Sequence, residues 1–405
     1  MIKRWLEEDL RRNLSVRRGV HLTGARQCGK STLAEYVAGG KMRHLVLDDA
    51  AILKAAKDDP MTFVERRDGR TLVIDEIQKA PELLNAIKSK VDHDNSRGQY
   101  LITGSSNLHF VKAVSDPLAG RLGHIRLRTL TLGEIRSGTG DFLQRAFSRD
   151  FPQVSDKFDK RDVIHCAFCG GYPEPIDFDV KSRIEWYRGY LDDILRKDVP
   201  DVTEIRRVDA LRKVAHWLLA YSSKFFELKN LCAVSGISKE TAVTYLSLLK
   251  ALYLFDEVPP WSDSDYAKLG KRPKYFAADA GLLANLLGWD EDSVYYDDDA
   301  CGKLVETWVH HELSALADMH AGYELTQYRD SDKREIDFLV KGTNGELLGV
   351  EVKFGTVGAG DFKHMKWFAS RFAKERFTGI VLYSGKDVLS FGGGMYAVPL
   401  IALAS

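Results

Sequence analysis

The sequence predicts an α/β fold in which a parallel sheet is followed by a helical segment, a winged helix-turn-helix and a small α/β domain. Three observations predict it. Strand-like and helix-like runs alternate over residues 18–130, as in a parallel sheet with helices on both faces. The pattern turns mainly helical from about residue 130 to 217, and charged strand-like runs return after residue 320. We therefore expect domains at 1–150, 151–290 and 291–405.

Composition sets the broad class of protein. A chain of 405 residues is long enough for two to four domains of roughly 100–200 residues. Lys+Arg and Asp+Glu both number 58, so any surface for nucleic acid must be local. The five cysteines are an odd number, the charged N-terminal stretch is no signal peptide, and no apolar run reaches the ~20 residues of a membrane span. We expect a cytoplasmic protein without a membrane partner.

The N-terminal part begins with a helix and a strand. Residues 2–14 have apolar positions at helical spacing and predict a docking helix. Residues 20–23 end a buried strand, and residues 32–38 open a helix. The loop between them fits G-x-x-x-x-G-K-S, the phosphate-binding P-loop. The predicted nucleotide-binding residues are Gly24, Ala25, Arg26, Gln27, Cys28, Gly29, Lys30, Ser31 and Thr32.

The residue types in this loop suit a nucleotide phosphate. Gly24 and Gly29 let successive backbone N–H groups face one anion, and the helix adds its positive N-terminal end. Lys30 would reach the β- and γ-phosphates, and the Ser31 hydroxyl would bind Mg²⁺. The alternative is a chance match in a glycine-rich turn.

The next elements bring an acidic pair. A strand over residues 44–49, helices over 50–57 and 60–66, and a helix over 81–93 surround the apolar strand 71–76. That strand ends in Asp75, which would hold Mg²⁺ through water, and Glu76, which would orient or deprotonate the attacking water. The alternative is a strand followed by an acidic helix cap.

Two candidates for contact with the γ-phosphate follow. The strand 99–107 ends in Ser105, Ser106 and Asn107, any one of which suits a sensor. Arg121, in a short turn, is either an arginine finger, in cis or in a neighbouring subunit, or a surface arginine paired with an acid. Arg126 and Arg128 flank the next strand and are expected to be solvated.

The cysteine pair C-x-x-C at Cys166 and Cys169 carries no metal prediction. A structural zinc site needs four ligands, and no second pair follows at zinc-finger spacing. Two small buried thiols ahead of a Gly-Gly turn are expected instead.

Residues 208–278 have the pattern of a winged helix-turn-helix. Helices over 211–221, 226–234 and 239–252 are expected, with Ser238 capping the third, and strands over 253–258 and 274–278 would form the wing. The third helix would bury Ala242, Val243, Leu246, Leu249 and Leu252. The wing tip would present Lys268, Lys271, Arg272 and Lys274 to a DNA backbone, although nearby acids suit a protein partner equally.

The C-terminal part has a second acidic constellation. Strands over 335–340 and 347–354 carry Asp337, Glu351 and Lys353 within apolar runs, and the helix 302–313 carries Glu306. Asp337, Glu351 and Glu306 would hold Mg²⁺, while Lys353 would polarise water, as in a metal-dependent phosphodiesterase. The alternative is a hairpin face with an internal salt bridge.

Together these residues resemble prokaryotic AAA-superfamily ATPases with an archaeal-type core. In those proteins the core is joined to a winged helix and to a C-terminal domain related to PD-(D/E)xK nucleases. The motifs that carry the resemblance are GARQCGKST at 24–32, LDD at 47–49, VIDEIQKAPELL at 73–84, LITGSSN at 101–107, LAGRL at 118–122, GGYPEP at 170–175, GKLVETWVHHEL at 302–313, REIDFLV at 334–340 and VEVKFG at 350–355.

The resemblance implies Mg-ATP binding at Gly29, Lys30 and Ser31, with Asp75 and Glu76 as the acidic pair. It also implies a nuclease-type site at the four C-terminal residues named above. This chain departs from the pattern only by Ser31, where threonine is common, and by Cys28 inside the loop.

The hypothesis from sequence is therefore an ATPase with ATP and Mg²⁺ as cofactors and DNA as the expected partner. ATP hydrolysis would move the domains and gate a cleavage site. The competing hypotheses are a nucleotide-switched scaffold with an inactive nuclease fold and a protein partner, and a homo-oligomeric translocase in which Arg121 acts in trans.

Overall fold

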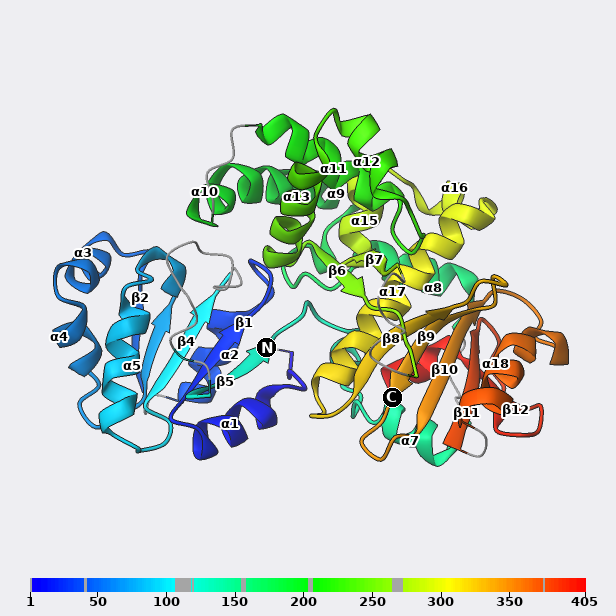
Figure 1. The fold of residues 1–405 in the computed structure, drawn as a ribbon, viewed down its shortest axis with the longest axis horizontal. Coiled ribbons are helices and arrows are strands. Elements are labelled where there is room, and N and C mark those ends of the chain that lie inside the picture. Colours follow the sequence, from blue (N-terminus) through cyan, green and yellow to red (C-terminus); the bar gives the residue numbers. More distant parts are fainter. Residues whose placement is uncertain are drawn as a thin grey trace.

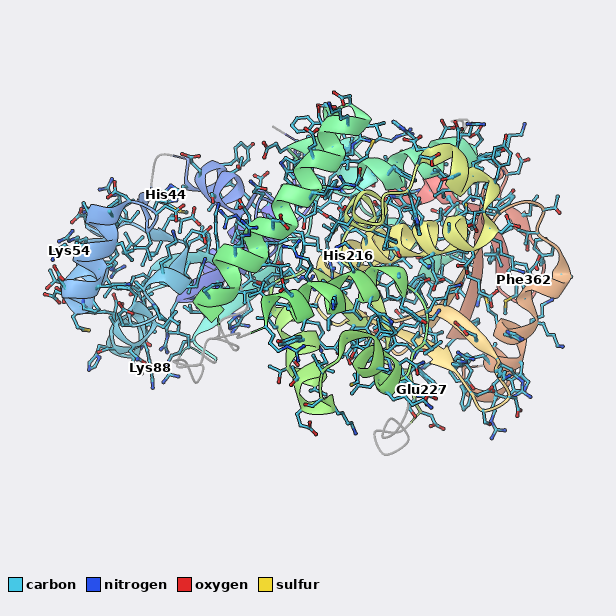
Figure 2. All side chains as sticks on the ribbon, turned by 90° about the horizontal axis from the view of Figure 1, so that it is seen from above. His44, Lys54, Lys88, His216, Glu227 and Phe362 are labelled. Atoms are coloured by element: carbon cyan, nitrogen blue, oxygen red, sulfur yellow. The ribbon has the colours of Figure 1, made fainter. Side chains whose placement is uncertain are left out.

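The computed structural model of the protein describes residues 2–39, 42–105, 118, 120–153, 158–202, 207–263, 272–373 and 376–405. Three parts follow one another along the chain: an N-terminal sheet unit, a helical unit, and a C-terminal sheet unit (Figure 1). Viewed from above, His44, Lys54 and Lys88 mark the N-terminal unit at one end, and Phe362 marks the C-terminal unit at the other (Figure 2). His216 lies in the helical unit between them. Ser106, Asn107, Lys268 and Lys271 lie outside the described residues.

The N-terminal unit is a parallel sheet whose order, within the described ranges, is β2-β3-β4-β1-β5. Its strands are β1 (Gly19–Thr23), β2 (Arg43–Val46), β3 (Leu72–Asp75), β4 (Tyr100–Gly104) and β5 (Leu122–Arg126). Its helices are α1 (Glu7–Val16), α2 (Lys30–Ala38), α3 (Ala50–Asp58), α4 (Pro60–Glu65), the 3-10 helix η1 (Ile77–Lys79) and α5 (Leu83–His93). Because β4 lies between β1 and β3, the strand that ends in Asp75 is one strand removed from the P-loop strand.

Strand alternation explains why this sheet has a core on each face. Along β3, Val73 faces one apolar cluster, while Leu72 and Ile74 face the other. Leu101 and Ile102 on β4 divide in the same way, since successive side chains point to opposite faces of a sheet. Helices therefore cover both faces, and the sheet holds the P-loop on a rigid base.

The helical unit connects the two sheets. Its elements are α6 (Leu132–Ile135), α7 (Phe142–Ser148), α8 (Lys160–Cys169), η3 (Pro175–Asp177), α9 (Val180–Asp193), the π-helical turn η4 (Ile194–Asp198), α10 (Val199–Val202), α11 (Val208–Ala220), α12 (Leu228–Ser235), α13 (Lys239–Ala251), β6 (Phe255–Val258), β7 (Lys274–Ala277), α15 (Ala280–Leu287) and α16 (Glu291–Tyr296). Strands β6 and β7 pair in antiparallel register. Gly171 faces the backbone of Leu130 so closely that a Cβ there would lie 2.0 Å from the Leu130 carbonyl oxygen, which explains the Gly-Gly turn after α8.

Helix α13 forms largely as its sequence pattern predicts. The Ser238 hydroxyl accepts a hydrogen bond from the Thr241 backbone N–H at 3.2 Å, so Ser238 is the N-cap. The expectation that Val243 is buried was wrong: its side chain is 49% exposed. Tyr245 and Leu248 are buried in its place, because the packed face of α13 is rotated toward them.

The C-terminal unit is a mixed sheet whose order, among the residues described, is β12-β13-β11-β10-β9-β8. Its elements are α17 (Asp298–Asp318), β8 (Glu324–Arg329), β9 (Glu335–Lys341), β10 (Leu347–Lys353), η5 (Ala359–Phe362), α18 (Lys363–Phe368), the π-helical turn η6 (Ala369–Ala373), β11 (Phe377–Tyr383), β12 (Leu389–Ser390), β13 (Met395–Pro399) and η8 (Leu400–Ala404). Strands β9 and β10 pair in antiparallel register, and β10 pairs with β11 in parallel register. Helix η8 packs against α6 and α7, so the far end of the chain contacts the segment that follows the first sheet.

Buried ion pairs join the three parts. The Arg128 guanidinium bonds Asp256 on β6 and, at 2.7 Å, Asp318 on α17. Arg126 approaches the other oxygen of Asp256 at 2.7 Å. The expectation that Arg126 and Arg128 are solvated was therefore wrong: the Arg128 side chain is only 10% exposed because it fills the junction of the three parts.

Among the described helices, none is both long enough and apolar enough to span a membrane.

Candidate functional site

The P-loop lies where β1 meets α2. Gly24 and Gly29 have φ values of 150° and 100°, which favour glycine, and they turn the chain so that α2 begins at Lys30. Lys30 is 4% exposed, and its ammonium donates to the carbonyl oxygens of Gly24 at 3.0 Å and Ala25 at 2.8 Å. The amino end of α2 and a buried cation thus meet at one point, which suits an anion.

The acidic pair lies at the same carboxyl edge of the sheet, at the end of β3. The Asp75 carboxylate accepts hydrogen bonds from the Thr103 hydroxyl on β4 and from the Glu76 backbone N–H. Glu76 has a φ of 59°, so the chain turns sharply out of the strand at this residue. This conformation is strained for a non-glycine residue, and residues strained in this way cluster at functional sites.

A small hydrogen-bond network orients the Glu76 side chain. The Gln78 amide donates to Glu76 and, at 3.0 Å, to the Ser105 hydroxyl at the end of β4. Burial raises the pKa of Glu76, while the nearby Lys30 charge opposes that rise. Of the three predicted sensor residues, Ser105 is the one the structure describes, and it lies within this network.

Three further residues at the P-loop edge were missed by the sequence argument. The Arg4 guanidinium donates to the carbonyl oxygen of Cys28 at 2.9 Å and bonds Glu134 at 3.0 Å, so it fixes the back of the loop. Thr103 and Gln78 hold the acidic pair, as described above. Gln78 and Thr103 stand inside the motifs quoted above, but nothing in the sequence marked Arg4, which precedes the first predicted strand by many residues.

Arg26 connects the P-loop to the helical unit. Its guanidinium bonds Asp198 of η4 at 2.6 Å, and its backbone carbonyl accepts a hydrogen bond from the Tyr190 hydroxyl of α9 at 3.2 Å. Although burial alone would lower the pKa of Arg26, the charge of Asp198 raises it, with a smaller contribution from Glu76. The side chain therefore lies within the field of the acidic pair and also contacts the next unit.

Arg121 lies at the amino ends of the parallel strands, opposite the carboxyl ends where the P-loop and the acidic pair lie. It precedes β5, whose first residue pairs with Gly19 at the start of β1, whereas the P-loop follows the end of β1. The Arg121 guanidinium bonds Asp92 near the end of α5. The structure does not bring Arg121 together with the P-loop of its own chain.

Residues 16–136 match a protein-family model described as an AAA domain. These residues form a P-loop ATPase core of the AAA type. The rest of the chain matches two models described as domains of unknown function, over residues 160–293 and 301–403.

Two relatives and one solved structure align with most of the chain. Uncharacterized proteins of Mycobacterium tuberculosis and Mycobacterium bovis are each 28% identical over 352 residues, covering 85% of this chain and 72% of the relative. The solved structure of a Walker-type ATPase of Pyrococcus abyssi has 16% identity and a TM-score of 0.43, covering 71% of this chain and 96% of that one.

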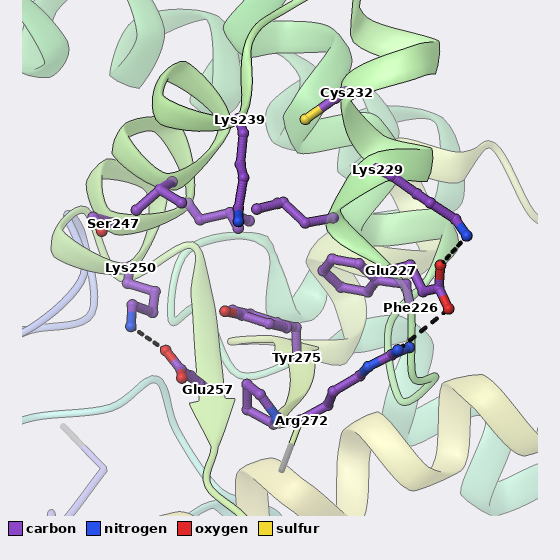
Figure 3. A pocket seen from close by; sticks show the side chains of 14 residues that line it. Phe226, Glu227, Lys229, Cys232, Lys239, Ser247, Lys250, Glu257, Arg272 and Tyr275 are labelled. Atoms are coloured by element: carbon purple, nitrogen blue, oxygen red, sulfur yellow. Dashed lines mark hydrogen bonds and ion pairs between the residues drawn. The ribbon is translucent and has the colours of Figure 1, made fainter. Parts of the chain in front are cut away.

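Beyond the AAA core, the helical unit has an open groove of about 770 Å³ between α12, α13 and the β6–β7 sheet (Figure 3). Its floor is apolar and aromatic, including Phe226, Leu246 and Tyr275. Four cations line it, namely Lys229, Lys239, Lys250 and Arg272. Its two acids are already paired: Glu227 with Lys229 and Arg272, and Glu257 with Lys250.

Lys274, expected at the wing tip, is not on this surface. Its side chain is 2% exposed and points into the C-terminal unit, where its ammonium lies 2.9 Å from Glu306 and 3.6 Å from Asp337. Glu335 lies at 2.7 Å on its third side. The expected contact of Lys274 with a DNA backbone was therefore wrong, because carboxylates of another unit hold the side chain.

The other predicted C-terminal residues lie around this cluster. Asp337 on β9 accepts a hydrogen bond at 3.3 Å from the backbone N–H of Val352 on β10, next to Glu351. Burial and the charge of Asp337 raise the pKa of Glu351 to about 8. The Lys353 ammonium instead bonds Asp361 in η5. Glu306, Asp337 and Glu351 thus lie in one region of the C-terminal unit. Lys353 is paired with Asp361 and is not part of the group of carboxylates around Lys274.

This arrangement does not fit a metal ion. In the part of the chain that the structure describes, no group of three or more His, Cys, Asp or Glu side chains is placed to hold one. An ammonium stands between the carboxylates that the sequence assigned to Mg²⁺. The P-loop is a different case, because Mg²⁺ there would take a hydroxyl, water and phosphate oxygens as ligands, and such a donor set needs few carboxylates.

Proposed function

We propose that this chain hydrolyses Mg-ATP at its P-loop and that the nucleotide state moves the helical and C-terminal units relative to the AAA core. One observation carries the proposal. A buried lysine at the amino end of α2 and the acidic pair at the end of β3 lie at one edge of a parallel sheet.

The roles of the P-loop residues follow from their positions. Backbone N–H groups of the loop and the Lys30 ammonium would bind the phosphates. The Ser31 hydroxyl and the Asp75 carboxylate would hold Mg²⁺, whose charge offsets the charge that develops on the phosphate oxygens.

Glu76 would act as the general base. It would accept a proton from the attacking water as that oxygen bonds to the γ-phosphorus and the bond to the bridging oxygen breaks, leaving ADP and phosphate. Burial raises the pKa of Glu76, which makes its carboxylate a stronger base than a solvated glutamate.

Arg26 would report the nucleotide state to the helical unit. A γ-phosphate and Asp198 are both anions that attract this guanidinium, so phosphate binding competes with the Arg26–Asp198 bond. Loss of the bond would loosen η4 and α9 from the loop. A role for Arg121 in hydrolysis requires a neighbouring subunit, since it lies at the opposite sheet edge.

DNA is the partner that we propose for the helical unit. Helices α11 to α13 followed by the β6–β7 pair suit a winged helix-turn-helix, and the groove beside α13 carries more cations than acids. A protein with an acidic surface is the second candidate partner. The C-terminal unit, in which Asp337 and Glu351 lie on paired strands, would have a nuclease-like fold that carries out no cleavage.

The test is steady-state ATP hydrolysis by the full chain, with and without single-stranded, double-stranded and branched DNA. Glu76→Gln should bind ATP and lower kcat about a hundredfold or more, since a general base contributes that much. Lys30→Ala should lose ATP binding. A gel of the same DNA with Mg²⁺ or Mn²⁺ should show no cleavage.

The outcomes separate the parts of the proposal. Hydrolysis that is stimulated by DNA supports a DNA partner. Hydrolysis that is indifferent to every DNA favours a protein partner. ATP turnover by Glu76→Gln at the wild-type rate would remove Glu76 from its role as the base.

A further inference from the structure

Lys274 bridges two parts of the molecule that are distant in sequence. It begins β7 in the helical unit, while its three carboxylate partners come from α17 and β9 of the C-terminal unit. The ammonium lies 2.7 Å from Glu335, 2.9 Å from Glu306 and 3.6 Å from Asp337. A single side chain therefore joins the β6–β7 sheet to the face of the C-terminal sheet.

The surroundings stabilise this cation strongly. Burial alone would lower the pKa of Lys274, but the charges of Glu306, Asp337 and Glu335 raise it well above the usual value of a lysine. The ammonium also lies 5.3 Å from the centre of the Phe225 ring, where the ring face attracts a cation. Lys274 is thus a permanently charged group within the acidic cluster.

A divalent ion and this ammonium cannot share the cluster. Mg²⁺ requires oxygen ligands at about 2.0–2.1 Å in octahedral geometry. The carboxylates that would supply those oxygens are turned toward an ammonium that already neutralises part of their charge. A second cation at the same point would also be repelled by the first at a separation of a few ångströms.

We infer that Lys274 is the resident cation of the cluster formed by Glu306, Glu335 and Asp337, two of which the sequence assigned to Mg²⁺. The cluster is one side of an ion pair between two units. The chain binds no divalent metal there while the Lys274 ammonium lies among the three carboxylates. This inference does not depend on ATP hydrolysis, so it stands or falls separately from the proposed function.

The experiment is a titration of the full chain with Mn²⁺ alone, without nucleotide, following free Mn²⁺ by its electron paramagnetic resonance signal. Lys274→Met replaces the ammonium by an apolar chain of similar length. Lys250→Met is the matched control, because Lys250 also pairs with a carboxylate of the helical unit, Glu257, but lies in the open groove. Thermal unfolding confirms that each variant is folded.

The wild type and Lys250→Met are expected to bind Mn²⁺ only weakly. Adding Asp337→Asn to either of them should not change its Mn²⁺ affinity. Lys274→Met is expected to gain a single Mn²⁺ site at least about tenfold tighter, because carboxylates without a counter-cation attract a hard divalent ion. Asp337→Asn in the Lys274→Met background should abolish that site.

Two results would overturn the inference. The first is Mn²⁺ binding by the wild type that Asp337→Asn removes. The second is a folded Lys274→Met protein that gains no Mn²⁺ site. If Lys274→Met does not fold, the wild type and Asp337→Asn decide the matter alone: equal and weak binding supports a resident lysine, and a difference between them contradicts it.

Discussion

Glu76 and Glu351 are carboxylates with raised pKa values, and their surroundings differ. Glu76 receives hydrogen bonds from Gln78 and Ser105 and lies near the Lys30 charge. Glu351 has Asp337 as its strongest charged neighbour, and the Lys353 charge only partly compensates. A carboxyl in the second setting is stabilised in its neutral form, so it affects how stability depends on pH.

Glu351 should make the protein less stable as pH rises. Its pKa in the folded state is about 8, above the ordinary value, so between roughly pH 4.5 and 8 the folded chain holds a proton that the unfolded chain has lost. The free energy of unfolding therefore falls with rising pH across this window, by at most about 1.4 kcal/mol per pH unit from this group. Glu351→Gln should flatten that fall, as measured by urea unfolding from pH 5 to pH 9.

The control for this experiment is Glu324→Gln, at the exposed start of β8. Its stability should follow the wild-type pH profile. If Glu351→Gln also follows that profile in parallel, Glu351 ionises normally in the folded protein and the prediction is wrong.

For single residues, the sequence predicted which side chains would lie close together but not which of them would form ion pairs. The G-x-x-x-x-G-K-S spacing and the strand end at Asp75 place both groups at one sheet edge, because parallel strands share their carboxyl edge. Lys274 could not be assigned from sequence, since its partners begin over thirty residues later in another unit. Glu335 had a usable signal, because it precedes Asp337 by two residues and so lies on the same face of β9.

The link between the P-loop and the end of α9 is the element through which a nucleotide would act. Tyr190 lies on α9 and Asp198 closes η4, and both contact Arg26. The π-helical geometry of η4 continues α9 with a wider turn, a local feature that is frequent at functional sites. Movement of Arg26 would therefore displace the whole of α9.

Asp198→Asn should uncouple this helix from the nucleotide. ATP affinity should stay within about tenfold of wild type, since Asp198 bonds the loop at the Arg26 side chain. The nucleotide-dependent change in amide hydrogen exchange over α9 should be lost. Asp193→Asn, which removes the exposed Lys197–Asp193 pair one turn earlier, is the control and should leave that change intact.

Elements themselves were predicted well where a local signal existed. Helices α3, α4 and α13 begin at residues 50, 60 and 239, where the sequence predicted them, and Ser238 caps α13 as expected. The caps of the other two, Asp49 and Asp59, were not named from the sequence. The first helix begins at Glu7 and not at residue 2, because residues 2–6 are held instead by contacts such as that of Arg4 with the P-loop. Such tertiary contacts leave no local pattern.

For the whole molecule, Arg128 is the residue in which the three parts meet. It joins the segment after β5 to Asp256 in the helical unit and to Asp318 in the C-terminal unit. The charges of Arg126 and Arg128 outweigh burial and hold the pKa of Asp256 far below its usual range. The three parts are thus coupled by charge at a buried point.

Arg128→Met should destabilise the junction by about 3 kcal/mol, because it removes one of the two arginines that pair with the buried Asp256 and also removes the partner of Asp318. Urea unfolding followed by fluorescence and by far-UV circular dichroism should then give separate transitions in place of a shared one. Arg43→Met removes the exposed Arg43–Asp68 pair and should cost less than about 1 kcal/mol. Coincident transitions at unchanged midpoints in Arg128→Met would show that the parts are coupled elsewhere.

The contact of η8 with α6 and α7 also constrains how the protein is made. A ribosome adds about 5–20 residues per second, so residues 132–148 wait on the order of 20 s before residues 400–404 exist to cover them. During that time the apolar side chains of Phe142 and Leu143, both buried in the finished fold, lack that cover. We therefore expect the segment after the first sheet to need protection, such as a chaperone gives, until synthesis reaches η8.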